Sequence, residues 1–216
     1  MAKTVIVGDV HGCLDELRAL LKKCAFAPGD TLMFVGDLVA KGPDSQGVLQ
    51  FVRESGGSSV LGNHDAHVLL FRSGGTIKEH HRQVAQTLKE DDWRFLEALP
   101  LWRTLPAFNS IVVHAGLKAG VPLEEQSRDD VINMRSIDAS GQPSKRVEGG
   151  MPWAASWPGP RRVIFGHDAI RGLQQYPHAL GLDTGCVYGR QLTAVVLPEN
   201  RLVSVAAARA YQKPGA

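Results

Sequence analysis

The stretch Gly36-Asp37-Leu38-Val39-Ala40-Lys41-Gly42-Pro43 decides the fold that we predict for this chain. It follows the apolar run 31–35, which is typical of a buried strand. The carboxylate of Asp37 therefore stands where a strand opens into a loop. In open α/β sheets, ligands bind at that end of the strands. We expect Asp37 to belong to a functional site.

The same pattern recurs along the chain, with an apolar run that leads into a glycine-containing loop carrying Asp, Asn or His. The runs are 5–7, 60–61, 111–113 and 163–165. The polar residues that follow them are Asp9 and His11, then Asn63, His114 and His167. Glycine beside such residues permits turns and close backbone approach that other residues resist. We interpret the repetition as one site assembled from several strand ends.

Alternation of strand, loop and helix predicts an α/β fold with a single domain over 1–216. Apolar residues at helical spacing predict a helix over 15–24, with Asp15 as its N-cap. Asp44 is expected to cap a second helix that ends near Ser55. Further strands are expected at 162–165, about 179–182, 191–197 and 201–206.

Two segments interrupt this alternation. The polar segment 73–105 has helical propensity and is predicted to be a helical cap or insertion within the domain. The segment 136–160 is rich in Gly, Pro, Ser and charged residues, and a loop of this length is usually functional or mobile.

Composition excludes some classes of function. The formal net charge of the 216-residue chain is +2, so a duplex nucleic acid would find no strong basic field. No apolar run approaches the length of a membrane span, and the N-terminus lacks a secretory apolar region. Cys13, Cys24 and Cys186 show no metal-type spacing and cannot all pair, which favours a reducing, cytoplasmic location.

The polar residues at the strand ends are oxygen and imidazole nitrogen donors. Such donors suit Mn²⁺, Fe or Zn²⁺, and the lack of a nearby set of thiolates argues against a structural zinc site. Two metal ions ~3.5–4 Å apart can hold both oxygens of an in-line phosphoryl displacement. Asp37, which follows an expected central strand, is placed to be shared between them. The pattern therefore predicts a dinuclear hydrolase.

Several motifs occur in a fixed order: Gly8-Asp9-Val10-His11-Gly12, Gly36-Asp37, Gly62-Asn63-His64-Asp65, His114-Ala115-Gly116 and Gly166-His167. This order resembles the calcineurin-like metallophosphoesterases, specifically the serine/threonine phosphoprotein phosphatase branch. The stretch 36–43 and the stretch Leu182-Asp183-Thr184-Gly185-Cys186-Val187-Tyr188-Gly189 are similar to signatures of a narrower group. That group comprises the symmetrical diadenosine tetraphosphatases of the ApaH type and the ApaH-like phosphatases. The resemblance runs from Lys3 to about Val205 and is weakest in the middle.

The resemblance implies a four-layer αββα sandwich of two mixed sheets, with two divalent ions at the carboxyl ends of the strands. Mn²⁺ is the first expectation, with Fe, Zn²⁺ and Co²⁺ as alternatives. Metal one would take Asp9, His11 and Asp37, and metal two would take Asp37, Asn63, His114 and His167. A hydroxide bridging the metals would attack phosphorus, and His64 would protonate the leaving oxygen. Asp37 and His64 are thus the expected catalytic residues.

Departures from the protein phosphatase pattern bear on the substrate. Protein phosphatases have Asp, which orients the catalytic histidine, where this chain has Ala40, and Arg where it has Lys41. The partner of His64 is therefore open, with Asp65 and Asp168 as candidates. A lysine is a mobile point charge, whereas arginine grips phosphate in two places, so Lys41 suits a polyphosphate chain.

We therefore expect symmetrical cleavage of dinucleoside polyphosphates, in particular of diadenosine tetraphosphate to two ADP. Lys41, Arg135 and Asn63 are the expected substrate-binding residues. Alternatives are a phosphoserine/threonine protein phosphatase, a polyphosphatase, a hydrolase of RNA nucleotide caps, and a non-catalytic adaptor. Phosphoproteins and capped RNA thus stay possible partners.

Other aromatic and imidazole side chains have open roles. Trp153, Trp157 and Tyr188 could stack on a base or could pack in the core. His67, His80, His81 and His178 match no motif and are predicted to be surface or packing residues.

Overall fold

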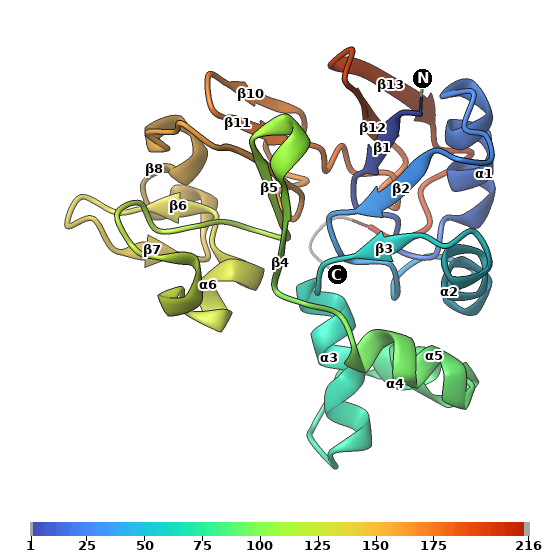
Figure 1. Cartoon of the computed structure of the whole chain (residues 1–216). Helices are drawn as coiled ribbons and strands as arrows, with labels where there is room; N and C mark the ends of the chain where they lie inside the picture. Colours follow the sequence, from blue (N-terminus) through green and yellow to red (C-terminus); the bar gives the residue numbers. More distant parts are fainter. Residues whose placement is uncertain (1, 214–216) are drawn as a thin grey trace.

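The computed structural model describes residues 2–213 and contains two mixed five-stranded sheets (Figure 1). Sheet A has the order β13 (Arg201–Ala206), β12 (Gln191–Leu197), β1 (Thr4–Val7), β2 (Thr31–Phe34), β3 (Ser58–Ser59). Sheet B has the order β10 (Gln174–Tyr176), β11 (Ala179–Gly181), β9 (Arg162–Phe165), β5 (Ser110–Val113), β4 (Trp102–Leu105). Strands β1 to β3 run parallel, as do β5, β9 and β11, while the outer pairings are antiparallel. The predicted α/β class and its two mixed sheets are confirmed.

The two sheets pack face to face because their strands are apolar on both sides. In β1, Ile6 belongs to the core between the sheets, where it joins Ile164 of β9. Its neighbours Val5 and Val7 belong to the core beneath the helices on the other side of sheet A. Successive side chains in a strand point to opposite faces, so this unbroken apolar run buries both faces of the sheet.

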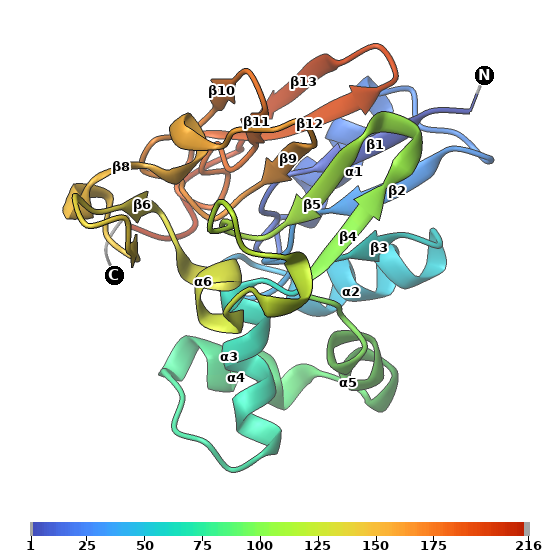
Figure 2. The same ribbon diagram turned by 60° about the vertical axis from the view of Figure 1, so that its left-hand side comes forward.

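Helices α1 (Leu14–Lys23) and α2 (Ser45–Glu54) cover the outer face of sheet A. Helix α6 (Arg128–Asn133) lies on the side of sheet B (Figure 2). Asp44 caps α2 as expected, and its carboxylate accepts a hydrogen bond of 2.7 Å from the amide of Gly47. The expectation for Asp15 was wrong. Helix α1 begins one position earlier, with Cys13 as its N-cap, because burial of Leu14 extends the apolar face.

A lobe of helices extends from the sheets and consists of α3 (Asn63–Arg72), α4 (Glu79–Thr87) and α5 (Glu90–Glu97) (Figure 1). The helices expected in 73–105 are present, but 102–105 forms the edge strand β4. This strand pairs with β5, which offered a free edge for hydrogen bonding. Among residues 2–213, no helix has both the length and the apolar character that a membrane crossing needs.

The segment 136–160 is more regular than the predicted loop. It contains a small antiparallel sheet of β7 (Pro143–Ser144), β6 (Ser136–Ile137) and β8 (Met151–Pro152). Trp153 follows β8 and is buried against Phe165 of sheet B, with ring centroids 4.8 Å apart. This anchor attaches the segment to the core, and such long-range packing has no local signature in the sequence.

Asp92 fastens the helical lobe to the rest of the fold. It is fully buried and accepts hydrogen bonds from the Lys89 amide at 2.9 Å and the Arg53 guanidinium at 2.8 Å. We expect Asp92→Ala to lower the free energy of unfolding by about 2–4 kcal/mol, because it removes a helix cap and the partner of a half-buried charge. Urea denaturation measures the change. Asp91→Ala is the matched control, since the Asp91 side chain is 67% exposed and lies 4.0 Å from Arg53. An equal loss in both variants would contradict the prediction.

Candidate metal centre

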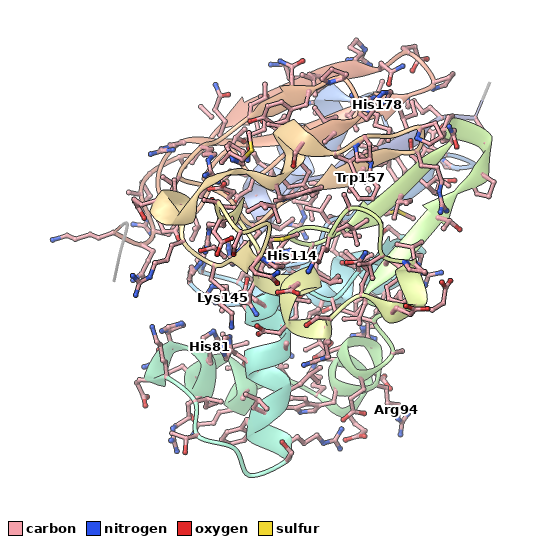
Figure 3. The ribbon with its side chains drawn as sticks, turned by 90° about the vertical axis from the view of Figure 1, so that its left-hand side faces the viewer. His81, Arg94, His114, Lys145, Trp157 and His178 are labelled. Carbon is pink, nitrogen blue, oxygen red and sulfur yellow. The ribbon has the colours of Figure 1, made fainter. Side chains whose placement is uncertain are left out.

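The donors predicted from the strand ends meet at one place in the structure. Asp9 follows β1, Asp37 follows β2 and Asn63 follows β3 at the start of α3, all from sheet A. His114 follows β5 and His167 follows β9, from sheet B. Every one of these side chains is buried. The carboxyl ends of both sheets therefore enclose a single centre, and Figure 3 labels one of its donors, His114, between the sheets and the helical lobe.

Asp37 lies between the donors that were assigned to the two metals. Its Oδ2 is 3.5 Å from Nε2 of His11 and 3.5 Å from Nε2 of His114. Oδ1 of Asn63 is 3.0 Å from Nε2 of His114 and 3.0 Å from Nδ1 of His167. Ligands about 2.1 Å from one ion lie roughly 3.0–3.4 Å from each other. The spacing and the chemistry of these residues therefore fit divalent cations that share Asp37.

Each of the three histidines offers one ring nitrogen to the centre and hydrogen-bonds a backbone carbonyl through the other. This arrangement fixes the ring and its tautomer, as is usual for metal-binding histidines. Burial lowers the pKa of all three rings, that of His114 to about 4, and so favours the neutral, metal-binding form. The carbonyls belong to Val39 for His11 (3.1 Å), Val35 for His114 (2.9 Å) and Asn133 for His167 (3.0 Å).

Carboxylates crowd the same centre. Burial raises the pKa of Asp37 to about 6. Burial and then the neighbouring Asp183 and Asp37 raise the pKa of Asp9. Such a concentration of buried negative charge requires cationic partners. Asp183 was not among the predicted site residues, although it follows β11 in the same pattern of an apolar strand and a polar loop.

The backbone is strained where the donors are held. The backbone angle φ is positive at four residues of the site: 48° at His11, 50° at Asp37, 67° at Lys41 and 68° at His167. Residues other than glycine rarely adopt such angles. Such strain persists only where the surrounding structure enforces it, and it clusters at functional sites. At Gly166, an added Cβ would collide with Oδ1 of Asp9, so only glycine lets this loop approach the carboxylate. The predicted role of glycine, which is to permit close approach of the backbone, is confirmed at Gly166.

His64 lies beside the centre at the start of α3. Its amide donates to Oδ1 of Asp37 at 2.9 Å, and its Nδ1 lies 2.9 Å from Nε2 of His81. The two carboxylates expected to be partners of His64 bind other groups instead. Asp65 accepts hydrogen bonds from the amides of Leu38, Val39 and Gly62, and Asp168 pairs with Arg171 at 2.6 Å. Within residues 2–213, neither carboxylate contacts His64.

His81 was predicted to be a surface or packing residue, and that role was incomplete. It is buried, and its hydrogen bond to His64 places it in the site. The sequence around it is a polar helix with no motif, so no local signal could have identified it. His67 is exposed, while His80 and His178 are half-buried.

A cavity of about 260 Å³ opens over the donors. Lys41 enters it from one side, with Nζ 3.3 Å from Nε2 of His11 and 5.3 Å from the ring centre of Tyr188. Arg135 enters near the other donors, and its guanidinium donates to the carbonyl of His167 at 3.2 Å. The predicted substrate residues thus share one cavity. Its lining comprises His11, Asp37, Lys41, Asn63, His64, Arg135, His167, Ala169, Ile170, Asp183, Tyr188 and Arg190.

The tryptophans do not line this cavity. Trp153 is 3% exposed, and Trp157 packs against it with ring centroids 6.1 Å apart. Trp153 therefore packs in the core, whereas Trp157 is half-buried against it. Tyr188 is half-buried and lines the cavity.

The arrangement of donors agrees with a known family. The family model described as calcineurin-like phosphoesterase matches residues 2–202. The chain belongs to this family. In calcineurin-like phosphoesterases, divalent metal ions serve the hydrolysis of phosphoesters, and the donor set described above fits such ions.

Relatives of this calcineurin-like phosphoesterase cover almost its whole length. It is 29% identical to the asymmetrical bis(5'-nucleosyl)-tetraphosphatase PrpE of Oceanobacillus iheyensis, over 97% of this chain and 94% of the relative. It is 31% identical to the symmetrical bis(5'-nucleosyl)-tetraphosphatase of Aromatoleum aromaticum, over 94% and 96%. A crystal structure provisionally assigned as a diadenosine tetraphosphatase superposes with a TM-score of 0.89 and 42% identity, over 95% of this chain and 94% of the other.

Proposed function

We propose that this phosphoesterase cleaves dinucleoside tetraphosphates symmetrically, diadenosine tetraphosphate giving two ADP. The observation that carries the proposal is the placement of Lys41 and Arg135 in one cavity. Lys41 lies beside His11, and Arg135 lies beside His167, on the two donors that were assigned to different metals. Positive charge at both ends of the centre suits a chain of phosphates better than a single phosphoester.

The size of the cavity supports the same substrate class. At about 260 Å³ it holds phosphate groups rather than a complete dinucleotide. The nucleosides must therefore lie on its rim. Ile170, which is 65% exposed, and the half-buried Tyr188 both line the cavity. These apolar surfaces suit a base.

When bound, the two divalent cations would polarise the phosphoryl oxygens and lower the pKa of an attacking water. Asp9, His11 and Asp37 would hold one, and Asp37, Asn63, His114 and His167 the other. Lys41 and Arg135 would neutralise the phosphates that do not react, and Asn63 lines the same cavity.

His64 would protonate the departing oxygen. Its Nδ1 faces His81, so Nε2 is the ring nitrogen left to serve the cavity. Burial, followed by the charges of His11 and Lys41, lowers the pKa of His64. A bound polyphosphate places negative charge beside the ring and raises its pKa again, so the substrate itself promotes the acid form.

Asymmetrical cleavage, to ATP and AMP, is a second candidate. It is favoured by the relative from Oceanobacillus iheyensis, whose identity and coverage are close to those of the symmetrical relative. The two reactions need the same centre and differ in which phosphorus lies over it. Product identity distinguishes them.

The test is chromatography of the products after Mn²⁺-loaded protein is incubated with diadenosine tetraphosphate. We expect ADP alone. ATP with AMP would support asymmetrical cleavage, and an intact dinucleotide beside a dephosphorylated phosphoserine peptide would overturn the proposal. Tripolyphosphate and a capped RNA in parallel reactions test the remaining alternatives. Reactions with Fe, Zn²⁺ and Co²⁺ compare the metals, for which Mn²⁺ is our proposal.

We also propose that the protein works in the reducing cytoplasm. Cys13, Cys24 and Cys186 are buried free thiols, which supports this location. Labelling of the thiols in protein purified without reductant tests it, and a disulfide would count against it.

A further inference from the structure

His81 reaches the site from a different part of the fold than the donors do. It lies in the first turn of α4, on the side of the helical lobe that faces the sheets (Figure 3). The residue is 2% exposed, so its imidazole is shielded from water. Its Nε2 is 2.9 Å from Nδ1 of His64, and the two ring centroids are 5.0 Å apart. This distance between the two ring nitrogens is that of a hydrogen bond.

We propose that His81 is the positioning residue of His64, which it orients so that a proton on Nε2 of His64 points into the cavity. The proposal rests on the function assigned to His64 above. Ala40 contributes only a methyl group here, and Asp65 is occupied by backbone amides. Among residues 2–213, His81 is thus the side chain that hydrogen-bonds the His64 ring.

The hydrogen bonds of His81 determine which tautomers of His81 and His64 are compatible with each other. Nδ1 of His81 is buried and has no partner in the part of the chain that the structure describes. A buried N–H without an acceptor is rarer than a buried acceptor without a donor. The proton of neutral His81 therefore belongs on Nε2, from which it is donated to Nδ1 of His64. In the resting protein, an Nδ1 that accepts leaves the single proton of neutral His64 on Nε2. When bound phosphates raise the pKa of His64, the His81 proton on Nε2 shifts to Nδ1 of His64 and a solvent proton replaces it on Nδ1 of His81. Release of the Nε2 proton to the departing oxygen then leaves His64 neutral.

The surroundings of His81 hold it in this orientation. The ring of His80 packs against it with centroids 4.0 Å apart, and burial, followed by His80, lowers the pKa of His81 to about 3. His81 therefore remains neutral and able to direct a single proton. The lobe itself is tied to α2 through Arg53 and Asp92. His81 is thus preorganised before substrate binds, which is what a positioning group requires.

Kinetics of paired variants test the role. We expect His81→Leu to lower kcat on diadenosine tetraphosphate about 10- to 100-fold with little change in KM, since loss of an orienting partner typically has this effect. In a His64→Ala background, His81→Leu should cause no further loss, because two residues acting as one unit are not additive. His81→Gln should restore most of the activity, since its amide can donate to Nδ1 of His64.

His67→Ala is the matched control, because His67 is exposed and its ring lies 5.1 Å from that of His81 with no hydrogen bond between them in residues 2–213. It should stay close to wild type. An equal loss from His81→Leu with and without His64 would overturn the proposal and show a structural role. So would unchanged kcat in His81→Leu, or failure of His81→Gln to recover activity in a folded protein.

A measurement without substrate separates this proposal from the proposed function. Long-range ¹H–¹⁵N spectra of Zn²⁺-loaded, ¹⁵N-histidine-labelled protein report which nitrogen of His64 carries the proton. We expect Nε2 in the wild type and a mixture of tautomers in His81→Leu. The same spectrum in both would overturn the proposal. Absence of dinucleotide cleavage by the wild type would count against the function and leave this result intact.

Discussion

Replacement of Asp37 by asparagine should abolish the shared metal position and lower kcat by about 1,000-fold or more, since Lewis-acid stabilisation is worth several kcal/mol. Oδ2 of Asp37 is 3.5 Å from Nε2 of both His11 and His114, so one carboxylate oxygen faces both halves of the donor set. Asparagine has nearly the same shape but no negative charge. The effect is measured as metal content by mass spectrometry, together with kcat in Mn²⁺.

Asp44→Asn is the control for this experiment. Asp44 lies on the same loop but is exposed, and it caps α2 by accepting from the Gly47 amide. Asparagine caps helices as well as aspartate does, so metal content and kcat should be unchanged. Full metal content in Asp37→Asn, or turnover near that of the wild type, would mean that Asp37 does not join two metals.

The donor set could be predicted because its signals are local. Each donor immediately follows an apolar strand, and parallel strands bring their carboxyl ends to one edge of a sheet. Val5, Ile6 and Val7 illustrate the point, because they fill cores on both faces of sheet A and deliver Asp9 to the centre. A short stretch of sequence contains both the strand and its ligand.

The rest of the site depends on contacts between distant segments. His81 meets His64 only because α4 packs beside α3, and a polar helix gives no sign of which face docks. The same limit applies to Trp102 in β4, which forms a strand because β5 has a free edge. It applies also to Trp153, whose ring reaches Phe165. In each case tertiary packing overrides the local pattern.

Replacement of His64 by alanine should lower kcat on diadenosine tetraphosphate about 100- to 10,000-fold, the range that a general acid contributes. The metal donors should keep their metals, because the side chain of His64 lies beside the donor set and its amide, which bonds Asp37, is retained. The measurements are steady-state kinetics and metal content of the same preparation. Loss of metal in His64→Ala would mean that this histidine is a ligand rather than an acid.

The leaving group decides whether His64 acts by protonation. Phenolate is a much stronger base than p-nitrophenolate, so a departing phenolate needs a proton that p-nitrophenolate does without. His64→Ala should therefore impair hydrolysis of p-nitrophenyl phosphate much less than hydrolysis of phenyl phosphate, because only interactions made in the transition state change kcat. Equal losses on both substrates would assign His64 to binding or to maintaining the loop beside Asp37. A selective loss would show that its proton reaches the departing oxygen, and the tautomer directed by His81 would then have a direct chemical consequence.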